Sequence, residues 1–162
     1  MTNNALAFIA LCNEYCAAVE NAAASDARDF TSTMLRLLPR LYICAADLTD
    51  EGALDEGFID QALDEDSYDS VRRGIETVMG EDDTYLEVFE DDMKYSDTPI
   101  GASVAESLAD LFQVFYNLLE AVRDAPDDLV ASALAAVKED FAGYWGQVLC
   151  NVMRPLNAIY YR

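Results

Sequence analysis

Histidine is absent from this chain of 162 residues, and lysine occurs only twice, at Lys94 and Lys138. Several common kinds of site need histidine: Ser-His-Asp and Cys-His nucleophile systems, HExxH zinc sites, Glu-x-x-His di-iron bundles and two-His metal triads. The missing residue excludes all of them. We therefore assign no catalytic residue from the sequence, and we predict neither a cofactor nor a resident metal ion.

Positive charge is also scarce, because 10 Lys and Arg residues stand against 31 Asp and Glu residues, a formal net charge of −21. Such a charge repels the phosphates of nucleic acids and the anionic inner leaflet of a membrane, so we expect binding to neither. The hydrophobic fraction of 52% is too high for a disordered acidic tail. The charge fits a solubilised protein, a binder of basic partners, or an acidic mimic of nucleic acid.

Long apolar runs are missing as well. No window of about 18 uncharged apolar residues exists, so we predict no membrane span. The short apolar run Ala5–Cys12 follows no Lys or Arg, and Asn13 and Glu14 stand where an export signal has small residues. We therefore expect a cytoplasmic protein.

Four cysteines occur, Cys12, Cys16, Cys44 and Cys150. In a reducing compartment we expect no disulfide between them. Cys12 and Cys16 are four residues apart and share one face of a helix, where they could hold a metal only with two further ligands. We interpret them as buried small hydrophobic residues.

Apolar residues recur with a period close to 3.6 almost throughout, which predicts helices. The chain is long enough for one core, and we predict a single all-α domain over residues 1–162, a helical bundle of five to seven helices. Pro39 should bend the second helix without ending it, because the apolar pattern resumes in phase. We expect an ordered loop over Asp91–Gly101. The expected helices are Ala5–Ala24; one capped by Ser25 or Asp26 and reaching Leu48; a weaker stretch over Phe58–Met79, broken near Asp64–Asp66; a short one carrying Tyr85, Leu86, Phe89 and Met93; Val104–Val122; and a last one that opens at Pro126 and is perturbed at Pro155.

Two acidic residues in the second half of the chain lie at helical spacing. Glu106 and Asp110 are four residues apart and so share a helix face. With Glu90, Asp91, Asp92 and Asp97 they could converge on a hard cation such as Mg²⁺ or Ca²⁺, or they could form a solvated polar stripe. A second acidic stretch, Asp47–Phe58, has Phe58 where a calcium loop needs a bidentate carboxylate, and we interpret it as an acidic turn.

Gly143-Tyr144-Trp145-Gly146 is unusual inside a predicted helix, because each glycine costs about 0.5–1 kcal/mol there relative to alanine. The two glycines leave a shallow surface that a neighbouring backbone or a ligand can approach. Trp145 also continues the apolar stripe, which favours internal packing. Arg154, one of the few cations, lies two to three turns further along the chain.

The segments Tyr85–Gln113 and Phe141–Leu156 resemble the two recurring signatures of the bacterial family called domain of unknown function 5063, found mainly in Bacteroidetes. The most specific parts are the Tyr-Trp-Gly-Gln segment at 144–147 and a pattern formed by Asp92, Met93, Ser96 and Asp97. The first two predicted helices are similar to that family too. The resemblance implies a helical, cytoplasmic, single-domain protein and brings no assigned catalytic residue.

Our leading hypothesis is a non-enzymatic interaction module, an acidic helical bundle that binds another protein with a basic surface. One alternative is a carboxylate-based protein or enzyme that binds a divalent cation or a small molecule. Another is a nucleic-acid mimic that occupies a basic DNA-binding site. The sequence leaves a homo-oligomer open. The expected binding face consists of Asp91, Asp92, Tyr95, Asp97, Glu106, Asp110, Tyr144, Trp145 and Arg154.

Overall fold

Helices make up most of the computed structural model, which describes residues 1–49, 57–87, 94–95 and 98–162. The predicted all-α class is confirmed. Within these residues lie six α-helices, and a π turn over Phe141–Trp145 joins the last two into one rod. The helices are α1 (Asn3–Glu20), α2 (Ala27–Ala46), α3 (Glu65–Met79), α4 (Val104–Val122), α5 (Asp127–Asp140) and α6 (Gly146–Tyr160), with short 3-10 turns over Ala22–Ala24 and Gly80–Asp83.

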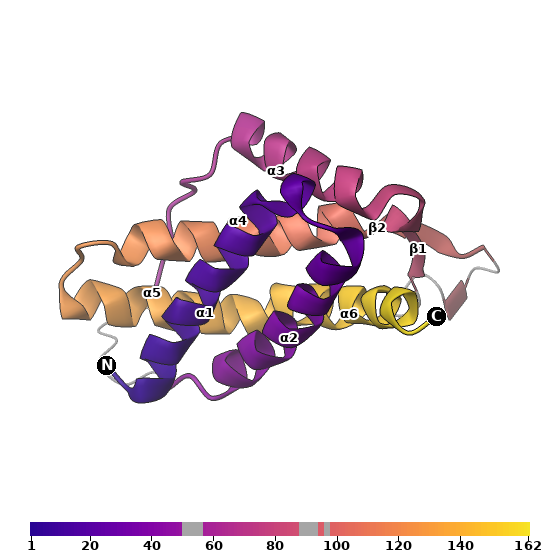
Figure 1. The fold of residues 1–162 in the computed structure, drawn as a ribbon. Coiled ribbons are helices and arrows are strands. Elements are labelled where there is room, and N and C mark those ends of the chain that lie inside the picture. Colours follow the sequence, from indigo (N-terminus) through magenta and orange to yellow (C-terminus); the bar gives the residue numbers. More distant parts are fainter. Residues whose placement is uncertain (50–56, 88–93, 96–97) are drawn as a thin grey trace.

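The helix α4 lies at the centre of the bundle, because it packs against α1, α3, α5 and α6. Figure 1 shows α5 and α6 following one another along one side of the molecule, with α1 and α2 crossing in front and α3 beside α4. The helices are amphipathic and bury their apolar faces in one hydrophobic core. None of the helices in the described ranges is long and apolar enough to cross a membrane.

Side-chain caps explain where four of the helices begin. Thr2, Asp26, Asp64 and Ser103 precede α1, α2, α3 and α4, and the side-chain oxygen of each accepts a hydrogen bond from a backbone N–H of the first turn. Such bonds satisfy donors that have no partner inside the helix. Of the two residues predicted to cap α2, Ser25 and Asp26, the cap is Asp26.

Two helices continue through proline. The helix α2 runs on past Pro39 to Ala46, as predicted, and α6 runs past Pro155 to Tyr160. Proline removes one backbone hydrogen bond from a helix, so packing has to hold such a helix together. Leu38 and Leu41, on either side of Pro39, are fully buried and supply that packing in α2.

An aromatic cluster at the centre of the core surrounds Trp145, which is fully buried. The centroid of its ring lies 6.1 Å from that of Phe8, 5.2 Å from Phe115 and 4.6 Å from Phe141, each in an edge-to-face arrangement. Its indole nitrogen donates a hydrogen bond of 2.9 Å to the carbonyl oxygen of Val137. The buried ring therefore fixes α1, α4 and the π turn against one another.

The helix predicted over Phe58–Met79 is wrong in its first part, because α3 begins only at Glu65 and residues 57–63 are not helical. The break expected near Asp64–Asp66 is correct, and Asp64 is the cap. Phe58 is 80% exposed, so its apolar side chain is no part of a buried helical stripe.

The non-helical segment 57–63 is held against α4 and α5. The buried side-chain oxygen of Asn117 accepts hydrogen bonds of 3.0 Å from the backbone N–H groups of Ala62 and Leu63. At Gly57 the chain passes so close to α5 that a Cβ atom would lie 1.8 Å from the carbonyl oxygen of Ser132. These bonds satisfy backbone groups that a helix would otherwise have paired.

A short antiparallel hairpin replaces the predicted short helix at Tyr85 and Leu86, and it also takes the end of the predicted loop. The strands are β1 (Thr84–Glu87) and β2 (Ile100–Ser103), with Tyr85 opposite Ala102. Four residues are too few for their alternation to stand out in a sequence dominated by a helical period. The other residues of that predicted helix, Phe89 and Met93, lie outside the described residues.

Candidate functional site

A polar groove of about 540 Å³ runs beside the first half of α4. The hairpin forms one wall, and the π turn with the start of α6 forms the other. We call it the α4 groove. It is lined by Tyr85, Glu87, Ile100, Gly101, Ala102, Ser103, Glu106, Ser107, Asp110, Gly143, Tyr144, Gln147, Val148 and Asn151.

The groove brings together three residues of the predicted binding face, Glu106, Asp110 and Tyr144. Glu106 is exposed and Asp110 is half-buried, as expected for two positions one helical turn apart on a partly covered face. Tyr144 reaches the groove from the π turn.

The other predicted residues lie elsewhere. Trp145 is fully buried, so its inclusion in an accessible binding face is wrong. Its ring lies in the aromatic core, where the apolar faces of the neighbouring helices meet. Tyr95 is 92% exposed and does not line the groove. Asp91, Asp92 and Asp97 lie outside the described residues.

Arg154 fastens the hairpin to α6. Its guanidinium donates a hydrogen bond of 2.8 Å to the carbonyl oxygen of Leu86, on β1. The hydroxyl of Tyr85 lies 3.0 Å from that of Ser107, which ties β1 to α4. Arg154 is therefore a support for one wall of the groove, where the sequence suggested a residue of the binding face.

The Asp83 carboxylate joins the hairpin side of the groove to the start of α4. Asp83 accepts one hydrogen bond of 2.7 Å from the hydroxyl of Ser103 and another of 2.7 Å from the backbone N–H of Ala105. Both donors lie at the start of α4, where a negative charge is favourable. The hairpin and the first turn of α4 are thus held as one unit.

Asp110 is the most constrained group in the groove. The hydroxyl of Tyr68, on α3, donates a hydrogen bond of 2.6 Å to its Oδ1 atom. The hydroxyl of Tyr144 also lies toward this carboxylate and favours its charged form. A carboxylate offers about four acceptor positions, so about two remain for a ligand.

The pKa values of Asp110, Tyr68 and Tyr144 are all raised in this part of the groove. Partial burial raises the pKa of Asp110, and the hydrogen bonds from Tyr68 and Tyr144 oppose that rise. Burial, together with the Asp110 charge, raises the pKa of both tyrosines. Both hydroxyls therefore stay protonated at neutral pH and act as donors to the carboxylate.

Removing one donor should raise the pKa of Asp110 further. In Tyr68→Phe the carboxylate loses a hydrogen bond that favours its charged form, and stability at pH 7 should fall by about 1.5 kcal/mol. Because the folded-state pKa of Asp110 is raised, its contribution to stability is present at low pH and is lost as the pH rises through that pKa.

An NMR titration of the Asp110 side-chain carboxyl carbon measures this change. Tyr85→Phe is the matched control, because the Tyr85 hydroxyl lies against Ser107 instead. An unchanged Asp110 pKa in Tyr68→Phe would show that the bond does not persist in solution.

Two further hollows adjoin the groove, and Asp110 and Gln113 line both of them. One opens toward α3 and the other toward α5. Every charged side chain that lines the groove or these hollows, within the part of the chain that the structure describes, is acidic. These acids are Asp64, Glu65, Asp69, Glu87, Glu106, Asp110 and Asp140.

Metal-binding groups do not gather in the described ranges, where no three or more Cys, Asp or Glu residues are close enough to hold an ion. Cys12 and Cys16 are buried, as predicted. Burial raises the pKa of both thiols, that of Cys16 to about 12, so they are poor ligands at neutral pH.

The π turn positions Tyr144, and it depends on Gly146. The backbone N–H of Gly146 bonds to the carbonyl oxygen of Phe141, five residues back. A Cβ atom at position 146 would lie only 2.6 Å from that oxygen. Turns of this kind are often found at functional sites. Tyr144 is half-exposed in the groove, whereas Trp145 points into the core.

Sequence reasoning missed Tyr68, Tyr85 and the π turn itself. Tyr68 and Asp110 are 42 residues apart, and no local pattern links them. The glycines at 143 and 146 were a usable signal for an irregular helix, although not for its register.

The fold and the groove define a class of protein, an acidic α-helical bundle with a carboxylate and tyrosine groove beside its central helix. The chain belongs to the family described as domain of unknown function (DUF5063), whose profile matches residues 1–162. It is similar to the crystal structure of protein BF1032 from Bacteroides fragilis, with 25% identity, a TM-score of 0.83, and coverage of 99% of this chain and 94% of that one. No curated protein matches the chain. The predicted family resemblance is confirmed.

Proposed function

We propose that this protein is a non-enzymatic interaction module whose α4 groove binds cationic side chains of a partner protein. The observation that carries the proposal is the Asp110 carboxylate, held by Tyr68 and Tyr144 where three acid-lined hollows meet. A cytoplasmic location and a basic partner belong to the same proposal.

Arginine matches the chemistry of this site. A guanidinium donates two parallel hydrogen bonds to a carboxylate, and about two acceptor positions of Asp110 remain for it. The tyrosine rings nearby offer faces to which a cation is attracted. The two tyrosines hold the carboxylate in place before the ligand arrives, which lowers the cost of ordering it. The net charge of −21 would steer a basic partner toward the protein.

The spacing of the acids suggests the form of the ligand. Glu106 and Asp110 are separated by one helical turn, about 6 Å along the axis of α4. An extended peptide advances about 6.6 Å in two residues, and side chains two apart point the same way. An extended segment with arginine at alternating positions would therefore place one cation at each acid.

Two synthetic peptides of equal charge test the proposal. Ac-Ala-Arg-Ala-Arg-Ala-NH₂ should bind several-fold more tightly than its isomer Ac-Ala-Arg-Arg-Ala-Ala-NH₂, measured by NMR titration at low salt. In Asp110→Asn the affinity for the first peptide should fall by roughly tenfold, because a charge-assisted pair is lost.

Glu14→Gln is the matched control, because Glu14 is exposed on α1, lines none of the hollows that meet at Asp110, and carries the same charge. Equal weakening in Asp110→Asn and Glu14→Gln would mean that the peptides respond only to net charge. That result would contradict the proposed function.

A further inference from the structure

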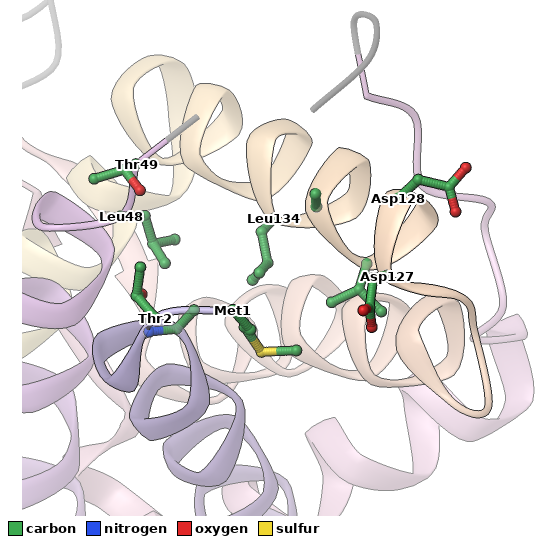
Figure 2. Close-up of a pocket in the computed structure, with 10 residues that line it drawn as sticks. Met1, Thr2, Leu48, Thr49, Asp127, Asp128 and Leu134 are labelled. Atoms are coloured by element: carbon green, nitrogen blue, oxygen red, sulfur yellow. Dashed lines mark hydrogen bonds between the residues drawn. The ribbon is translucent and has the colours of Figure 1, made fainter. Parts of the chain in front are cut away.

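An apolar hollow lies at the opposite end of α5 from the α4 groove, with a volume of about 250 Å³. The start of α1, the chain after α2 and the first turns of α5 enclose it. In Figure 2 the side chains of Leu48, Leu134 and Met1 converge on this space, and Asp127 lies at its edge. The two sites share no lining residue, and along the chain residues 135–142 lie between Leu134 in the hollow and Gly143 in the groove.

The walls of the hollow are core residues that lack a neighbour on one side. Leu48, Val130 and Leu134 line it, although each keeps only 4–6% of its surface exposed. Ala131, on the same helix, has too short a side chain to fill the space. Small-molecule sites commonly have volumes of about 300–1,000 Å³, so this smaller hollow suits one side chain of a partner.

The charges at the rim of the hollow indicate which kind of partner residue would neighbour the inserted side chain. Asp127 and Asp128 are the charged side chains that line the hollow in the described part of the chain, and both are acidic. They occupy the first turn of α5, where the helix end favours negative charge. A basic residue next to the inserted side chain would complement them.

We propose that this hollow is a second docking site, which takes one aliphatic side chain of a partner protein with an adjacent arginine or lysine facing Asp127. The inserted side chain acts as an anchor, because burying an aliphatic side chain in a pocket contributes about 1.5–3 kcal/mol. The α4 groove and the hollow together would bind a basic partner that also carries an exposed aliphatic residue.

Three peptides separate the two features of the proposed ligand: Ac-Ala-Leu-Arg-Ala-NH₂, Ac-Ala-Ala-Arg-Ala-NH₂ and Ac-Ala-Leu-Glu-Ala-NH₂. The first should shift the NMR methyl signals of Val130 and Leu134. The second should bind at this hollow about tenfold more weakly, because it lacks the buried aliphatic carbons. The third should not bind, because its charge is repelled.

Variants locate the binding. Ala131→Phe should abolish the shifts by filling the hollow, whereas Ala158→Phe, which adds the same ring at an exposed position of α6, should keep them. If Ala131→Phe fails to fold, Asp127→Asn should weaken binding of the first peptide several-fold, and Glu139→Gln, on the same helix, should not.

Three results would overturn this inference: equal binding of the first two peptides, unchanged shifts in Ala131→Phe or Asp127→Asn, or shifts confined to the α4 groove. The last of these would leave the proposed function standing.

Discussion

Replacing Trp145 with alanine is expected to lower the free energy of unfolding by about 3–5 kcal/mol. The side chain is fully buried and contacts the rings of Phe8, Phe115 and Phe141. Its removal leaves a cavity between α1, α4 and the π turn that these elements cannot close completely. The carbonyl of Val137 also loses its indole donor. Urea denaturation followed by circular dichroism measures the change.

Tyr144→Ala is the natural comparison, because it removes an aromatic ring from the preceding residue, which is 49% exposed. Its cost should be about 1–2 kcal/mol, mainly from the lost interaction with Asp110 and the partly buried ring. If the two substitutions cost the same, Trp145 is not the centre of the core in solution.

Alanine substitutions at Gly143, in the π turn, and at Gly146, directly after it, are expected to change the free energy of unfolding in opposite directions. Gly143→Ala should raise the free energy of unfolding by about 0.5–1 kcal/mol, because a Cβ atom there meets nothing within 4 Å and alanine favours the helix. Gly146→Ala should lower it by about 1–3 kcal/mol, because the same atom would press on the carbonyl oxygen and the ring of Phe141.

Each variant is the control for the other, because the two positions are three residues apart and receive the same side chain. Guanidinium denaturation of both variants gives the two signs under one condition. A stabilising Gly146→Ala would mean that residues 141–146 form an ordinary α-helix in solution, and Tyr144 would then not reach Asp110 as described.

The helices were predictable because their apolar stripes and caps are local. On α4, for example, Leu108, Leu111, Phe112 and Phe115 were expected on one face, and all four are buried. Burial of that stripe leaves Glu106 and Asp110 on a less covered side, so their shared face followed from the same pattern.

The contacts that make the groove were not predictable, because each joins residues far apart in the chain. The hydroxyl of Tyr68 comes from another helix, and the wall formed by β1 and β2 depends on strands of four residues. The binding face was expected to include Trp145 because its aromatic area suggested a ligand, whereas the apolar stripe to which it also belongs decided its place.

The π turn also sets the rotational phase of everything after it. A π turn holds one residue more than an α turn, and one residue corresponds to about 100° of rotation about a helix axis. If the same residues 141–145 were wound as an ordinary α-helix, α5 and α6 would join as one regular helix, with every side chain of α6 turned by that angle relative to α5. Gln147 and Asn151 would leave the groove, and Leu149 and Val152 would leave the core. The π turn therefore keeps Gln147 and Asn151 in the groove while Leu149 and Val152 stay in the core.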